Sequence, residues 1–131
     1  MSPVTHCLTG WVLANAADLS SRDRAIVTFA AVIPDVDGLG VFAEIVTRNS
    51  QHPLLWFSEY DHALHTLLFA GCVSACAFVM SQRRWITTSL AFVAFHLHLL
   101  EDLAGSRGPD GFNWPIPYLF PFTCSRLYGR S

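Results

Sequence analysis

Lysine is absent from this chain, and charge of either sign is scarce. The eight cationic residues are all arginines, no basic run occurs, and the formal net charge at pH 7 is -2. Charged residues make up only 14% of the chain, against about a quarter in a typical soluble domain. Because nucleic-acid binding depends on clustered positive charge, we expect no nucleic-acid partner.

Cysteine pairs with a metal-binding spacing are also absent. None of the four cysteines forms a Cys-x-x-Cys pair or a zinc-finger spacing, which argues against a thiolate metal site. Cys72 and Cys76 share a helical face among small apolar residues, and we expect both side chains to be buried as small hydrophobic groups. The N-terminal residues lack the charged and apolar segments of a signal peptide, so we expect no removable signal.

Apolar residues fill most of what remains. They make up 52% of the chain, and the mean hydropathy is +0.37, which favours a membrane protein or a deeply buried helical bundle. The apolar run over residues 63–80 approaches the roughly 20 residues needed to cross a bilayer. The first two predicted helices are shorter, so we expect partial or interfacial insertion, or association with further subunits in a homo-oligomer. A soluble cytoplasmic bundle with an apolar dimer face is the alternative.

Apolar residues recur at helical spacing without the alternation of strands, which predicts an all-α fold. We expect a single helical metal-binding domain, residues 1–131, built as a bundle of about five helices from two antiparallel hairpins. The predicted helices cover residues 5–18, 24–33, 41–47, 63–80 and 85–103. Residues 35–40 are expected to break the chain, and the tail rich in proline and aromatics, residues 112–122, to lie over the bundle as irregular chain.

Polar residues of the second hairpin occupy symmetric positions. Residues equidistant from the turn of an antiparallel hairpin lie side by side. His65 and Asp102 are almost symmetric about Arg83-Arg84. His98 lies four residues before Asp102, on the same helical face. The pattern therefore predicts that these three side chains meet at the end of the hairpin opposite its turn.

The first hairpin has the same symmetry. His6 and Asp35 are equidistant from the turn at Ser20-Ser21, and Asp37 lies within reach of the same end. Nitrogen and oxygen ligands without a thiolate favour zinc, with manganese or iron as alternatives. Because the donors outnumber the ligands of one tetrahedral ion, two ions sharing carboxylates would also use them. The predicted metal ligands are His6, Asp35, Asp37, His65, His98 and Asp102.

Four more residues are candidates for catalysis or substrate binding. Asp61 and His62 lie just before His65, so either side chain could orient a metal-bound water or accept its proton. Arg107 and Asn113 follow the predicted metal helix and are candidates to hold a phosphate oxygen. Solvated loop residues are the alternative interpretation of the second pair.

Three other polar residues are expected outside the site. His96 is two residues from His98 and points elsewhere on the helix, which predicts a structural or supporting role. Glu101 is similarly placed, and we expect it to face solvent. His52, beside Pro53 in a predicted loop, is expected at the surface.

The order of these motifs resembles that of bacterial membrane-bound metal-dependent hydrolases of the LexA-regulated inner-membrane type. The matching residues are His6 with Gly10, Pro34 to Asp37, His62 to Thr66, His98 with Asp102, and Trp114-Pro115. The His-x-x-x-Asp element is also distantly similar to that of zinc-dependent phospholipase C. The resemblance implies an all-helical fold at the bacterial inner membrane, a divalent metal on the six ligands named above, and hydrolysis of an ester or phosphoester.

These features predict a metal-dependent hydrolase of a small-molecule or lipid-like phosphoester or other ester, with Zn²⁺ favoured and Mn²⁺ or Fe²⁺ as alternatives. A di-iron redox bundle is a second class, because Glu59 and His62 form one Glu-x-x-His element. A third class is a non-catalytic membrane protein in which the polar cluster only fixes helix pairing.

Overall fold

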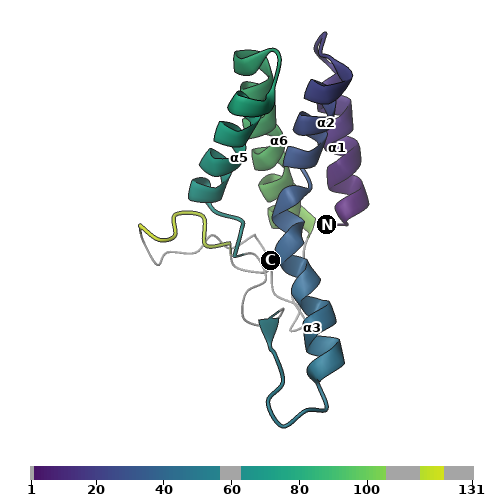
Figure 1. Ribbon diagram of the computed structural model, residues 1–131, viewed down its shortest axis with the longest axis vertical. Coiled ribbons are helices and arrows are strands. Elements are labelled where there is room, and N and C mark those ends of the chain that lie inside the picture. Colours follow the sequence, from purple (N-terminus) through teal and green to yellow (C-terminus); the bar gives the residue numbers. More distant parts are fainter. Residues whose placement is uncertain (1, 57–62, 106–115, 123–131) are drawn as a thin grey trace.

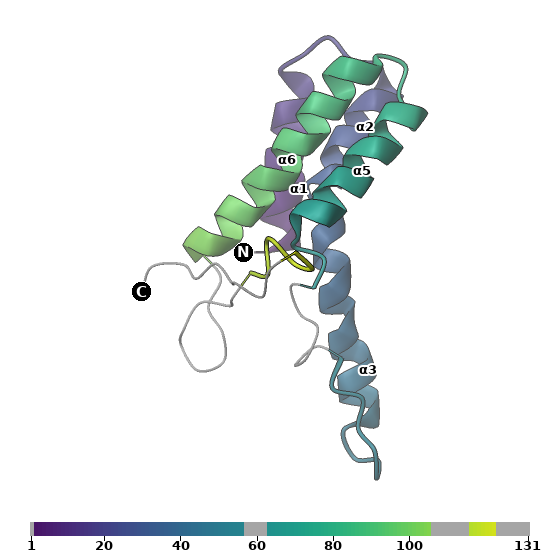
Figure 2. The ribbon, with the colours of Figure 1, turned by 90° about the vertical axis from the view of Figure 1, so that its left-hand side faces the viewer.

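The computed structural model describes residues 2–56, 63–105 and 116–122. Its elements are α1 (Pro3–Asn15), α2 (Ser21–Ala30), the 3₁₀ helix η1 (Ile33–Leu39), α3 (Gly40–Thr47), α5 (Leu67–Met80) and α6 (Arg84–Gly105). These residues form helices and no β-sheet, which confirms the all-α fold. Two antiparallel hairpins, α1–α2 and α5–α6, lie side by side and form a four-helix body (Figures 1 and 2).

Hydroxyl side chains fix where three of the helices begin. Ser2 accepts a hydrogen bond from the backbone N–H of Thr5, and Ser20 from that of Asp23. Thr66 does the same for α5. Such N-caps satisfy amide groups that have no partner within the helix. The predicted starts at residues 5, 24 and 63 were therefore wrong by a few residues, because the capping hydroxyl decides the boundary.

Asp23 joins the turn ends of the two hairpins. Its side chain is fully buried and accepts hydrogen bonds from the backbone N–H groups of Gln82 and Arg83, at 2.9 and 3.0 Å. These two amides belong to the turn between α5 and α6. The carboxylate thus fixes how far one hairpin can slide along the other, and so aligns their opposite ends.

Small residues let the helices of the body approach closely. The buried core contains Ala14, Val27, Ala30 and Ala91. Gly10 has the closest contact, because a Cβ atom there would lie 2.6 Å from the Cβ of Ala31. Only glycine permits this separation of α1 and α2.

Residues 35–40 do not break the chain, so that prediction was wrong. Pro34 lies at the start of η1, where a proline's missing N–H costs no hydrogen bond and its fixed φ suits a helix. The 3₁₀ helix continues directly into α3, and the two together, called the arm here, project away from the four-helix body (Figure 1). No residue of α3 is buried, and Phe42 and Val46 are 64% and 83% exposed.

The described part of the tail lies against the bundle, as expected. Ile116 is buried, and the carbonyl oxygen of Tyr118 accepts a hydrogen bond from the backbone N–H of Leu67 at 2.8 Å. Residues 112–115 of the predicted tail lie outside the described residues. The contact covers the end of the body where α5 begins.

The expected burial of Cys72 and Cys76 was wrong, because both are exposed. Helix α5 packs against α6 with one face only, and the two cysteines lie on another face, toward α2. The membrane prediction for residues 63–80 also changes, because α5 covers only Leu67–Met80. Among the described helices none alone is long and apolar enough to span a bilayer, whereas α2 followed by the arm passes the same test as a pair bent by 51°.

Candidate metal centre

Five side chains from four segments meet at the end of the body opposite the turns. Donor atoms of His6 in α1, Asp35 in η1, and His98 and Asp102 in α6 all lie within 4.8 Å of one another. His65, just before α5, adjoins this group. Four of the five are buried, and the side chain of Asp35 is 22% exposed. The structure therefore brings together five of the six predicted ligands.

A hydrogen bond from Nδ1, the ring nitrogen that faces away from the other donors and is called the outer nitrogen here, orients the imidazole of His98. Nδ1 lies 2.8 Å from the carbonyl oxygen of Ala31 and donates to it, because a carbonyl can only accept. In the neutral ring this leaves a lone pair on Nε2. That atom lies 3.1 Å from Asp102 Oδ2 and 3.7 Å from Asp35 Oδ1. A lone pair facing two carboxylates is repulsive unless a proton or a metal cation lies between them.

His6 repeats this arrangement from the other hairpin. Its Nδ1 lies 2.7 Å from Glu101 Oε2, and its Nε2 lies 3.3 Å from Asp102 Oδ1. Among the described residues Nε2 of His6 makes no hydrogen bond, although it is buried. The rings of His6 and His98 lie 3.9 Å apart. A carboxylate on the outer nitrogen fixes the tautomer that presents Nε2, as in carboxylate–histidine–zinc units.

Glu101 does not face solvent freely, so that prediction was wrong. Its side chain is only 21% exposed and accepts hydrogen bonds from His6 and from the hydroxyl of Thr9, the latter at 2.5 Å. His6 and Thr9 are three residues apart, so both point from the same face of α1. This spacing was the one signal in the sequence that could have indicated a shared acceptor.

His65 is supported in the same manner. Its Nε2 lies 3.0 Å from His98 Nε2 and 3.3 Å from Asp102 Oδ2. Its Nδ1 lies 3.4 Å from Asp37 Oδ2, and the same oxygen accepts a hydrogen bond from the backbone N–H of Leu64. Asp37 therefore lies behind His65, on the side away from the other donors, and orients the ring.

The close packing of imidazoles and carboxylates shifts the pKa values of both. Burial by itself lowers the pKa of His65, but the hydrogen bonds with Asp102 and Asp37 outweigh it and raise the pKa to about 9. The pKa of His6 is also raised, because Asp102 offsets its burial. Burial would raise the pKa of Asp102, yet its contacts with the three imidazoles hold that pKa far below its usual range. The site therefore favours a negative carboxylate surrounded by positive charge.

The spacing of the donors fits a small divalent ion. Zinc bonds of about 2.0–2.1 Å at tetrahedral angles place neighbouring donors about 3.3–3.4 Å apart. The individual separations include 3.0 Å for His65 to His98 and 3.7 Å for His98 to Asp35, and the donors of His6, Asp35, His98 and Asp102 all lie within 4.8 Å of one another. Buried Oδ2 of Asp35, like Nε2 of His6, has no hydrogen-bond partner among the described residues. A cation would satisfy both atoms.

Comparison with known proteins adds a location. A family described as the YdjM inner membrane protein matches residues 1–129. The chain belongs to this family. No curated protein and no solved structure matches. Membership confirms the expected place at the bacterial inner membrane, and because the description names no reaction, the chemistry has to be argued from the donor cluster.

Two further histidines among the described residues lie apart from the cluster. His96 makes its hydrogen bonds elsewhere, with Nδ1 2.8 Å from the carbonyl oxygen of Phe92 and Nε2 2.9 Å from the Tyr118 hydroxyl. It therefore links α6 to the tail. His52 is exposed, as expected. Four predicted catalytic or substrate-binding residues lie outside the described residues: Asp61, His62, Arg107 and Asn113.

Proposed function

We propose that this protein is a metal-dependent hydrolase of the bacterial inner membrane that acts on a phosphoester or other ester. The observation that carries the proposal is the convergence of three imidazole Nε2 atoms and two carboxylates, with the outer nitrogens of the rings facing oxygen atoms. Helix pairing alone does not require such an arrangement. Buried polar groups are costly unless they are satisfied, and an ion would satisfy His6 Nε2 and Asp35 Oδ2, which have no hydrogen-bond partner among the described residues.

Three buried donors of the group that lies within 4.8 Å are candidates to hold the ion. His6, His98 and Asp102 are each 4% exposed or less, and two histidines with one carboxylate form a ligand set used by catalytic zinc sites, which keep one position open. A bound divalent ion supplies a water of lowered pKa and stabilises the negative charge that develops during hydrolysis.

Asp35 and His65 are proposed to act on the water and the substrate. Asp35 is the most exposed member of the cluster, and its Oδ1 lies farther from His98 Nε2 than Asp102 Oδ2 does, at 3.7 against 3.1 Å. It therefore marks the side from which a substrate can enter, and its carboxylate can accept a proton there. His65 is oriented by Asp37 and lies beside Asp102. Its imidazole could there stabilise the substrate oxygen that becomes negatively charged during hydrolysis.

A structural metal site is the rival proposal, and one observation favours it. Four donors within 4.8 Å of one another would close a tetrahedral ion without an open position. The two proposals differ in what Asp35 does. In a closed site its loss weakens metal binding and stability together, whereas in a hydrolase its loss reduces turnover while the ion stays bound.

The test is metal content and hydrolysis of the full chain purified without chelator in lipid nanodiscs. The parent is expected to contain stoichiometric metal and to hydrolyse generic phosphodiester, phosphomonoester or carboxylic ester substrates. His98→Ala should lose both properties. His96→Ala is the matched control, because it removes a histidine from the same helix outside the cluster, and it should retain both.

Asp35→Asn separates catalysis from structure. It is expected to keep the metal and to lower kcat by about a hundredfold or more, the usual contribution of a proton-accepting group. Metal-free parent protein, or a His98→Ala variant that binds as much metal as the parent, would overturn the proposal. Stoichiometric metal with no hydrolysis of any ester class would favour the structural site.

A further inference from the structure

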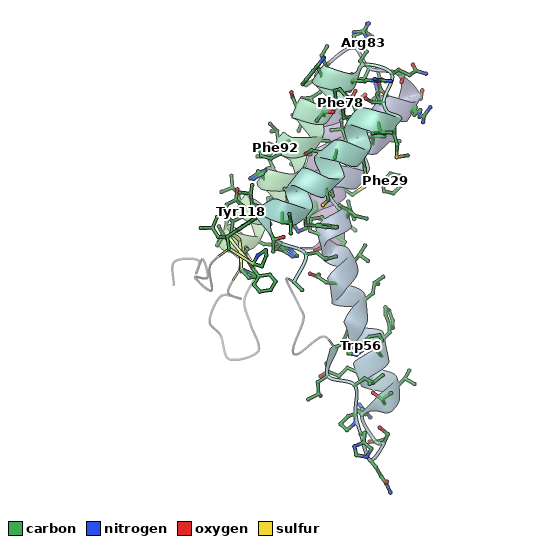
Figure 3. All side chains as sticks on the ribbon, turned by 60° about the vertical axis from the view of Figure 1, so that its left-hand side comes forward. Phe29, Trp56, Phe78, Arg83, Phe92 and Tyr118 are labelled. Carbon is green, nitrogen blue, oxygen red and sulfur yellow. The ribbon has the colours of Figure 1, made fainter. Side chains whose placement is uncertain are left out.

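An apolar groove runs between α2 and α5 on the outside of the four-helix body. It encloses about 570 Å³, within the range of roughly 300–1,000 Å³ typical of small-molecule sites. Among the described residues, Arg22 is the one charged residue that lines it. Small side chains such as Ala30 and Ala77 form its floor, and Phe29, which is 69% exposed and stands out from α2, forms part of its rim (Figure 3).

One end of the groove lies near the metal centre along the chain. Its lining extends from Arg22 in α2 to Ile33 at the start of η1, and along α5 from Met80 to Phe69. Either stretch is about 16 Å long at 1.5 Å per residue. Ile33 lies two residues before Asp35, and Phe69 lies four residues after His65. One end of the groove therefore lies within about one helical turn of Asp35 and His65 along the chain.

We propose that the groove binds one acyl chain of a lipid ester whose reacting bond lies at the metal centre. The inference rests on the proposed function and names its substrate class. A long, narrow, apolar channel excludes polar ligands and buries methylene groups, each of which gains free energy on leaving water. The inner membrane is the source of such chains. Arg22 lies at the far end, so the lining beside the reacting bond carries no positive charge.

Chain length is the first test, with a filled groove as the variant. Cys76 is exposed and lines the groove, so Cys76→Trp narrows it without entering the core. Val79→Trp is the control, because Val79 lies on the same helix, is 76% exposed and does not line the groove. The parent should hydrolyse dodecanoyl esters with a higher kcat/KM than acetyl esters of the same alcohol, by up to about fourfold for each buried methylene. Cys76→Trp should lose this preference and Val79→Trp should keep it.

A second measurement does not depend on turnover. A lipid whose acyl chain carries a photoreactive diazirine is incorporated into nanodiscs with the full chain and irradiated, and the labelled residues are mapped by mass spectrometry. Labelling of Phe29 and Cys72 should fall when excess dodecyl phosphonate is added, and should be unchanged by methyl phosphonate. Labelling of exposed residues elsewhere, such as Val12, should not respond.

The outcomes separate the two proposals. Competed labelling without hydrolysis of any ester would support the groove and contradict the hydrolase. Hydrolysis that is independent of chain length, with labelling that does not respond to the phosphonate, would leave the hydrolase and overturn the groove. Disulfide formation between the Cys76 thiols of two copies would also overturn it, because a second chain would then cover the groove.

Discussion

The four-helix body and α3, the outer part of the arm, bury their side chains to different extents. The body buries His6, His98 and Asp102 at one end, whereas no residue of α3 is buried, and Phe42 and Val46 are exposed. In water each choice costs free energy, because charge is removed from solvent in one case and apolar surface is left in it in the other. We therefore expect different surroundings to stabilise them, a bound ion for the polar cluster and a lipid phase for α3.

The largest effect is expected from removing the carboxylate of Asp102, which lies among the three imidazoles of the cluster. Asp102→Ala leaves three buried imidazoles without their shared negative charge. Breaking such a buried arrangement costs about 3–5 kcal/mol. Thermal unfolding of the full chain in detergent measures this loss. Asp18→Ala is the control, since its carboxylate is 90% exposed, and equal melting of the two variants would contradict a buried charged centre.

The alignment of the two hairpins gives the next largest effect. Asp23→Ala leaves the backbone N–H groups of Gln82 and Arg83 without an acceptor, and should lower the free energy of unfolding by about 2–3 kcal/mol. Arg83→Ala is the matched control. It removes only an exposed pair with Asp18 and keeps the amide that binds Asp23, so a change below about 1 kcal/mol is expected. Metal content should also fall in Asp23→Ala alone.

Loss of apolar surface from the arm should weaken membrane binding and leave the metal centre intact. Phe42→Ser is expected to cost up to about 1.5–3 kcal/mol of membrane affinity, the value of burying one large apolar side chain. Vesicle flotation of the full chain, together with quenching of Trp56 fluorescence by brominated lipids, measures the loss. Val12→Ser is the comparison, because Val12 is as exposed on the body as Phe42 is on the arm. Equal effects would remove the distinction between the two regions.

The smallest expected effect concerns how the melting temperature depends on pH: binding of a metal should reverse the direction of this dependence. Folding raises the pKa of the His65 imidazole from 6.5 to about 9. The protonated ring therefore contributes its full stabilisation below pH 6.5, and this contribution is lost as the pH rises through about 9. Chelated protein should therefore melt at lower temperature across this range. Ligand imidazoles bind a metal only when neutral, so zinc should stabilise the protein more as pH rises. Parallel melting curves with zinc and with chelator would contradict this prediction.

Much of the body could be predicted because its turns are polar and its helices are short. Symmetry about Arg83-Arg84 and about Ser20-Ser21 indicated which residues meet, and the structure brings His65 to Asp102 and places donor atoms of His6 and Asp35 within 4.8 Å of each other. Such reasoning needs only that the hairpins be antiparallel. It therefore works for residues on the facing sides of one hairpin.

Features that depend on how the hairpins pack together could not be predicted. Glu101 faces His6 because α1 lies against α6, and no periodicity within either helix specifies that contact. Cys72 and Cys76 are exposed because α5 is covered on one side only. The arm follows from Pro34 at a helix start, a position where proline continues a helix and does not end it.

Gly10 connects the seam between α1 and α2 to the chemistry of the site. The residue it touches, Ala31, is the one whose carbonyl oxygen accepts the Nδ1 proton of His98. A methyl group on Gly10 would push Ala31 away and carry that carbonyl with it. The imidazole would then lose the acceptor that selects its tautomer, so a position with no side chain and no donor atom governs which nitrogen of His98 faces the other ligands.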